Sequence, residues 1–205
     1  MIDFNWITDH EILAGCSGDV TFLVDVPGEF EPVPAELSVT RSLRVRGLMG
    51  GHCEFDIHLE RANAILLLAR ALNAVLEKYD VRISGLTGGT QNSAIPADAE
   101  AVLSLRPQDV AGVQALLAEL GETLRGEYQR AGDAIRLEVD EAPAPAQAFA
   151  QAAGERFARL TALIPNGVLS WSLLTPGVVE SSNNLGTLRP TDDGVRLAST
   201  ITAQV

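Results

Sequence analysis

The order of hydrophobic repeats between residues 37 and 140 constrains the fold of this chain more than any other feature. Apolar side chains alternate along four segments, which predicts strands at 37–48, 81–86, 99–105 and 135–139. They recur at helical spacing along two more, which predicts helices at 60–79 and 108–130. The order strand, helix, strand, strand, helix, strand is the ferredoxin-like βαββαβ pattern, in which an antiparallel sheet packs one face against two helices. We therefore expect an α+β fold.

Further elements flank this unit on both sides. Residues 20–26 alternate as a strand, and we expect the proline-rich loop 27–35 to join that strand to 37–48 as an antiparallel pair. After residue 147, helical spacing from Phe149 to Ile164 predicts a third helix. The strands at 178–188 and 195–205 follow, and Asp193-Gly194 between them suits a hairpin turn. The second half thus partly repeats the first, which suggests two lobes, 19–140 and 133–205.

Composition excludes some partners. The net charge is −12, from 27 acidic and 15 basic residues, so a nucleic-acid or anionic-membrane partner is not expected. The arginines at 41, 44 and 46 lie within the strand-like run 37–48 and are interpreted as its solvated face. Cys16 and Cys53 form no disulfide framework, and neither a basic leader nor a membrane-length apolar run is present. We expect a cytoplasmic protein.

The segment from Gly47 to His58 concentrates reactive residue types, with three glycines and two of the three histidines. A metal site at His52, Asp56 and His58 is disfavoured, because residues four and six apart across a glycine turn do not converge predictably. Cys53 adjoins His52, but neighbouring side chains point to opposite faces, which favours an inert thiol over a catalytic dyad. The remaining role for His52 is to donate a hydrogen bond to a carbonyl oxygen that gains negative charge.

Four motifs carry a resemblance to a known family. The stretch GLMGGHCEFDIHLERANAILLLAR, residues 47–70, resembles the GL-x-GGHSG-x-x-IH-x-G-x-GNA-x-x-LL-x-R segment of the aminoacyl-histidine dipeptidases, which are bacterial carnosinase-type zinc metallopeptidases. Residues 90–99 are similar to the T-x-R-NAIPR-E-A loop of that family, 165–168 to its PNGV segment, and 177–186 to its GVVETS-x-N-x-G segment. The resemblance covers essentially the whole chain in order.

The resemblance implies that this chain is one part of an enzyme. Members of the family are longer proteins, in which a lid, or dimerisation, domain is inserted into a zinc-binding catalytic domain. Residues 19–205 resemble the lid, and residues 1–18 resemble a remnant of the catalytic domain or a linker. Asn5 stands where the family has a zinc-binding aspartate, and an amide is a weaker ligand. Zinc is therefore expected in the full-length family and not as a cofactor of this chain.

The resemblance also assigns site residues by position. His52 matches the lid histidine that stabilises the oxyanion of the scissile carbonyl, and His58 matches a second family histidine without an assigned role. Ser93 replaces an asparagine, and Thr202 replaces an arginine expected to bind the substrate carboxylate, so both substrate-binding positions depart from the family. Cys53 replaces a serine, and Glu60 a glycine.

Two functions follow from these assignments. In the first, the chain is the lid of a zinc-dependent Xaa-His dipeptidase, inactive alone, with the catalytic domain of the parent enzyme as its partner and a homodimer as a further possibility. In the second, it is a degenerate, non-catalytic dimerisation or ligand-binding module. The departures at Asn5, Ser93 and Thr202 favour the second.

Overall fold

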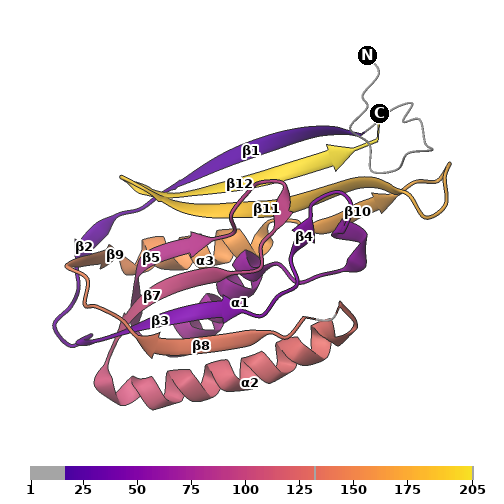
Figure 1. Cartoon of the computed structure of the whole chain (residues 1–205). Helices are drawn as coiled ribbons and strands as arrows, with labels where there is room; N and C mark the ends of the chain where they lie inside the picture. The colour runs from indigo at the N-terminus through magenta and orange to yellow at the C-terminus, as the bar shows by residue number, and fades with distance from the viewer. Residues whose placement is uncertain (1–16, 132, 205) are drawn as a thin grey trace.

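The expected α+β fold is confirmed by the computed structural model, which describes residues 17–131 and 133–204. Three α-helices lie within these residues: α1 Ala64–Lys78, α2 Val110–Tyr128 and α3 Gln151–Leu163. The strands are β1 Gly18–Pro27, β2 Phe30–Pro32, β3 Val39–Arg46, β4 Gly51–His52, β5 Val81–Gly88, β6 Ala94–Ile95, β7 Ala99–Leu105, β8 Arg136–Glu141, β9 Gln147–Phe149, β10 Gly167–Trp171, β11 Val179–Thr191 and β12 Gly194–Ala203. Figure 1 shows how the helices and the sheet are arranged.

The predicted βαββαβ unit forms one half of the main sheet. The strand order is β1-β12-β11-β5-β7-β3-β8, with β10 paired to β11. Within it, β8-β3-β7-β5 is the antiparallel arrangement that two helices, α1 and α2, connect. The other half consists of β10, β11, β12 and β1, and it joins the first through the bridge between Leu188 and Gly88.

One expected strand pairing is wrong. Residues 20–26 do form a strand, but β1 pairs with β12 along its whole length, from Gly18 opposite Ala203 to Pro27 opposite Gly194. Strand β3 cannot accept β1, because β7 and β8 occupy its two edges. The loop after β1 leads the chain away instead, and β2 within that loop pairs with β9.

A single cluster of buried side chains connects the two halves. It includes Leu43, Leu72 and Leu103 from the βαββαβ unit, together with Phe157 and Leu197 from the second half. Each of these side chains is at most 2% exposed. The predicted lobes 19–140 and 133–205 therefore share a core, and their division stays a prediction. So does the boundary at residue 18, since residues 1–16 lie outside the described part.

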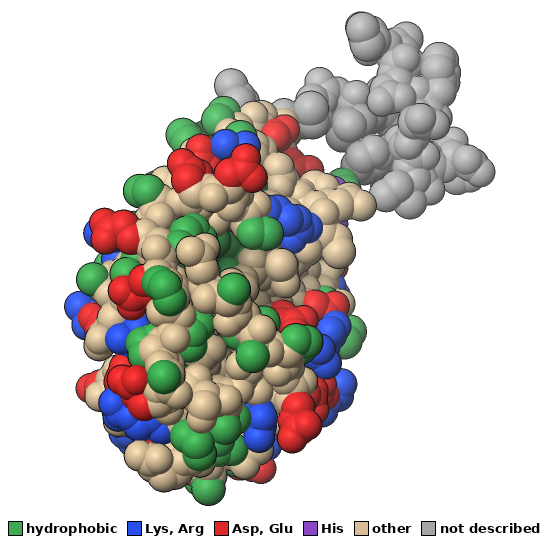
Figure 2. Space-filling model, turned by 90° about the vertical axis from the view of Figure 1, so that its left-hand side faces the viewer, with side chains coloured by type: hydrophobic (Ala, Val, Ile, Leu, Met, Phe, Trp, Pro, Cys, Tyr) green, Lys and Arg blue, Asp and Glu red, His purple; other side chains and the backbone are tan. Residues whose placement is uncertain are grey.

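The surface carries both signs of charge. Acidic and basic side chains are interspersed on the face that Figure 2 shows. On β3, Arg44 lies 3.3 Å from a carboxylate oxygen of Glu100, and Arg46 lies 2.7 Å from one of Asp98. These pairs match the interpretation of the arginines as a solvated strand face. None of the helices in the described residues has the length and apolar character needed to cross a membrane.

Candidate functional site

The glycine-rich segment that leads to His52 depends on backbone shapes that glycine favours. Gly47, Gly50 and Gly51 have φ values of 83°, 63° and 143°. A Cβ atom on Gly47 would collide with the carbonyl oxygen of Ala134. One on Gly51 would lie 2.7 Å from the carboxylate of Asp56. The segment therefore passes close to its neighbours at both ends.

Asp133, which lies between α2 and β8, holds this segment. Its carboxylate accepts hydrogen bonds from the backbone N–H groups of Met49, at 2.7 Å, and Ala62, at 3.0 Å. The residue is only 7% exposed. The N–H of Ala134 also donates to the carbonyl of Gly47 at 2.9 Å. Both ends of the segment that carries His52 are thus fixed by residues that follow α2.

A tight turn surrounds His52. The backbone N–H of His52 donates to the carboxylate of Asp56 at 2.8 Å, and the N–H of Asp56 donates back to the carbonyl of His52 at 3.0 Å. Within the turn, the N–H of Glu54 donates to Nδ1 of His52 at 3.2 Å. Because Nδ1 accepts this bond, the neutral imidazole carries its hydrogen on Nε2. The ring also packs on Phe55, with the ring centroids 4.8 Å apart.

The structure brings the three predicted site residues together. His52, Ser93 and Thr202 line one pocket of about 280 Å³. The pairing of β4 with β6 places His52 opposite Ala94, and the N–H of Cys53 donates to the carbonyl of Ser93 at 2.9 Å. On the other side, β1 and β12 place Asp19 opposite Thr202. The remaining lining residues are Asp19, Thr21, Cys53, Glu54, Asn92 and Thr200.

Two residues that sequence reasoning missed support the loop that carries Ser93. Asn184 on β11 is 1% exposed, and its amide donates to the carbonyls of Asn92, at 3.0 Å, and Ala94, at 2.9 Å. Thr187 donates to the side chain of Asn92 at 3.1 Å. Asn184 stands at the asparagine of the GVVETS-x-N-x-G segment, so the motif was the available signal.

Cys53 has the properties of an unreactive thiol. It is 4% exposed. Burial raises the pKa of the thiol, and the nearby carboxylates of Glu54 and Asp19 raise that pKa further. The thiolate, which is the nucleophilic form, is therefore disfavoured at neutral pH. This matches the interpretation of Cys53 as an inert thiol.

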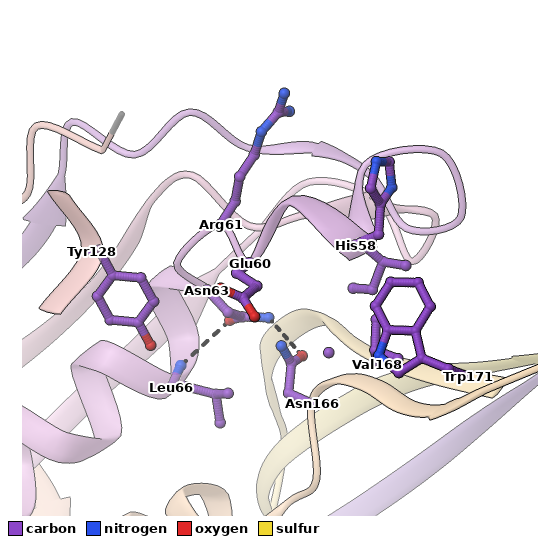
Figure 3. A pocket seen from close by; sticks show the side chains of 11 residues that line it. His58, Glu60, Arg61, Asn63, Leu66, Tyr128, Asn166, Val168 and Trp171 are labelled. Atoms are coloured by element: carbon purple, nitrogen blue, oxygen red, sulfur yellow. Dashed lines mark hydrogen bonds between the residues drawn. The ribbon is translucent and has the colours of Figure 1, made fainter. Parts of the chain in front are cut away.

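The three residues first considered as metal ligands do not converge. His58 lines a different pocket of about 360 Å³, and Asp56 pairs with Arg61 at 3.3 Å. In Figure 3, His58 and Trp171 lie toward one end of that pocket and Tyr128 toward the other. Across residues 17–131 and 133–204, no three His, Cys, Asp or Glu side chains gather as a possible metal site. These residues do not fit the zinc ion that the resemblance implies for the longer enzymes, and Asn5 lies outside them.

The PNGV segment has a structural role at the same pocket. Asn63 caps α1 by accepting from the N–H groups of Ile65, at 3.0 Å, and Leu66, at 3.4 Å. Its amide donates to Asn166 at 3.1 Å (Figure 3) and to the carbonyl of Leu185 at 2.9 Å. The start of α1 is thereby tied to β11.

Comparisons with known proteins agree with this architecture. Residues 43–131 match the family model described as a peptidase dimerisation domain. The chain is 33% identical over 189 residues to the cytosol non-specific dipeptidase of Escherichia coli (strain K12), which covers 92% of this chain and 39% of the relative. It also resembles the crystal structure of aminoacylhistidine dipeptidase from Vibrio alginolyticus, with a TM-score of 0.88 and 31% identity over 93% of this chain and 39% of that one. The chain thus spans well under half the length of these relatives.

Proposed function

We propose that this chain, in which residues 43–131 belong to the peptidase dimerisation domain family, is the lid of a dipeptidase and supplies His52 as an oxyanion-stabilising donor for dipeptide hydrolysis. The metal centre of that reaction is not among the described residues. We propose Xaa-His dipeptides as the substrate class, and a zinc-binding catalytic domain as the partner of the lid. A homodimer and a cytosolic location are parts of the same proposal, in line with the names of the family and of the E. coli relative.

The hydrogen bond from Glu54 to His52 carries the proposal. It occupies Nδ1 as an acceptor and leaves Nε2–H as the donor of the neutral ring. A tetrahedral intermediate has an oxyanion that needs such a donor, and loss of one donor of this kind commonly lowers kcat about 10²- to 10³-fold. His52 therefore has the chemistry that the role requires without a metal ligand or a nucleophile of its own.

The position of the pocket supports a catalytic domain as the partner of the lid. Gly18 and Ala203 lie opposite each other at the ends of β1 and β12, so the chain enters and leaves the lid through adjacent strands. An inserted domain needs ends that lie close together. Asp19 and Thr202, one residue further into these strands, line the pocket of His52. A catalytic domain attached at these strands would lie next to the pocket.

A chimera tests the proposal. The matching segment of the E. coli relative is replaced by this chain, and hydrolysis of a Xaa-His dipeptide is measured. We expect an active chimera in which His52→Ala lowers kcat about 10²- to 10³-fold with little change in KM, while His52→Gln restores part of the rate through its amide donor. His58→Ala is the matched control, because His58 lines the other pocket. A chimera with unchanged kcat after His52→Ala would refute the role of His52.

The degenerate binding module remains the second candidate, and the charge of the pocket favours it. The nine lining residues include the carboxylates of Asp19 and Glu54 and no lysine or arginine. A substrate carboxylate would find no cation there, since Thr202 stands at the position of the expected arginine. A chimera that folds and dimerises but hydrolyses no dipeptide would support this function over the first.

A further inference from the structure

An ion pair beside His52 has no assigned role. The carboxylate of Asp56 accepts the N–H of His52 at 2.8 Å, and its other oxygen lies 3.3 Å from the guanidinium of Arg61. Arg61 donates in turn to the carbonyl of Gly50 at 2.6 Å. The pair thus binds the backbone on both sides of Gly51, at the carbonyl of Gly50 and at the N–H of His52. Both side chains are partly buried, at 29% and 18% exposed, which limits solvent screening of the pair.

The same pair closes the turn that fixes the histidine. The N–H of Asp56 returns to the carbonyl of His52 at 3.0 Å, so two hydrogen bonds join residues 52 and 56. Glu54 lies at the middle of this closed turn, and its N–H donates to Nδ1 of His52 at 3.2 Å. The backbone amide that donates to Nδ1 thus lies within the turn that Asp56 closes.

Gly51 is shaped to admit this pair. A Cβ atom at residue 51 would meet the carboxylate of Asp56 and collide with the guanidinium of Arg61. The ion pair therefore lies directly against the backbone of the residue before His52. In the motif that carries the resemblance, Asp56 and Arg61 both fall at positions without a specified residue.

We propose that Asp56 and Arg61 are positioning residues, which hold the imidazole of His52 in the Nε2–H tautomer and direct it to the pocket of Ser93 and Thr202. This inference deepens the proposed function and rests on it for its catalytic consequence. Loss of Asp56 removes the acceptor of the His52 N–H and opens the turn. Glu54 then leaves Nδ1, and the ring is free to rotate and to exchange tautomers.

The tautomer can be measured in the chain itself. In the ¹⁵N-labelled protein near pH 8, two-bond ¹H–¹⁵N spectra of the imidazoles distinguish a protonated from an unprotonated ring nitrogen. We expect separate Nδ1 and Nε2 signals for His52 in the parent, and signals that move toward their average in Asp56→Ala and Arg61→Ala. Arg61→Lys should recover part of the separation, because an ammonium can pair with Asp56 but lacks the planar fork that also reaches Gly50.

Two controls separate positioning from general destabilisation. Asp98→Ala breaks another arginine pair, at 2.7 Å from Arg46, and should leave the His52 signals unchanged. Asp56→Asn keeps an acceptor oxygen without the charge, so it should fold even if Asp56→Ala does not, with an intermediate shift of the His52 signals. Signals identical to the parent in folded Asp56→Asn and Arg61→Ala would overturn the proposal.

The chimera then tests the catalytic consequence. Asp56→Asn should lower kcat about 10- to 100-fold with KM nearly unchanged, because the donor is misplaced and not removed. An unchanged kcat together with a lost tautomer preference would overturn the catalytic part. If His52→Ala leaves kcat of the chimera unchanged, the proposed function fails. The imidazole spectra still decide whether Asp56 and Arg61 position the ring.

Discussion

Replacing Asp133 with alanine should destabilise the fold through two backbone donors that lose their acceptor. These donors differ in their surroundings, because Ala62 is 0% exposed whereas Met49 is 58% exposed. Hydrogen bonds to a charged group contribute about 1.5–3 kcal/mol each, and an unsatisfied buried donor costs about 1–3 kcal/mol. We assign the upper end to Ala62 and about 1 kcal/mol to Met49, which water can reach. The free energy of unfolding should fall by about 3–4 kcal/mol.

Urea unfolding followed by circular dichroism measures this loss. With a denaturant slope of about 2–3 kcal/mol per molar, the midpoint of Asp133→Ala should fall by about 1–2 M. Asp133→Asn keeps one oxygen but turns its NH₂ group toward the other donor, so it should lose at least half as much. Asp98→Ala is the control, since an exposed ion pair contributes at most about 1 kcal/mol. Equal midpoints for Asp133→Ala and Asp98→Ala would refute the conclusion that Asp133 stabilises the fold through the N–H groups of Met49 and Ala62.

Three further predictions concern single residues. Glu60 has a left-handed backbone with φ of 55°, so Glu60→Gly should raise stability by about 0.5–1 kcal/mol and Glu60→Ala should not, as judged by thermal melting. A Cβ atom on Gly89, where φ is 63°, would collide with the carbonyl oxygen of Gly186, so Gly89→Ala should lower the free energy of unfolding by more than about 2 kcal/mol. Gly126 in α2 has open space around it, so Gly126→Ala should raise the free energy of unfolding by about 0.5–1 kcal/mol. In a Cys16→Ser background, Cys53 should react with iodoacetamide at least about tenfold more slowly than in urea at pH 8. Fast labelling of the native chain would contradict the burial of Cys53. Because folding raises the pKa of this thiol, its contribution to stability is present below the ordinary thiol pKa and is lost as the pH rises through the raised pKa.

The regular elements were largely predictable because hydrophobic periodicity is a local property. The strands of the βαββαβ unit and the helices α2 and α3 lie within a few residues of the predicted ranges. Helix α1 was predicted from residue 60 but begins at Ala64, because Asn63 caps it and Glu60 adopts a left-handed backbone. Apolar spacing carries no information about either feature.

Strand partners were less predictable, because they depend on which edges other strands leave free. Alternation along residues 20–26 indicated a strand whose apolar side chains share one face, and of these Val20, Phe22 and Val24 are 39–56% exposed while Val26 is 6% exposed. The pattern could not reveal that β1 would lie at the edge of the sheet beside β12.

The candidate site was predictable by residue but not by geometry. The resemblance selected His52, Ser93 and Thr202 separately, and their common pocket depends on the pairing of β4 with β6 and on the register of β1 with β12. The contact between Glu54 and Nδ1 of His52 depends on a turn that no residue type specifies alone. His58 had no assigned role, and it lines the other pocket.

The pairing of β1 with β12 also determines when β1 can fold during synthesis. The first described strand needs the last described one as its partner, so β1 leaves the ribosome before β12 and lacks this partner until β12 follows. At about 5–20 residues per second, this delay is about 10–40 s. Val20, Phe22 and Leu23 are at least half exposed even in the finished fold, and throughout the delay their strand also has two free edges. The nascent chain is therefore prone to misassembly at β1 until translation supplies β12.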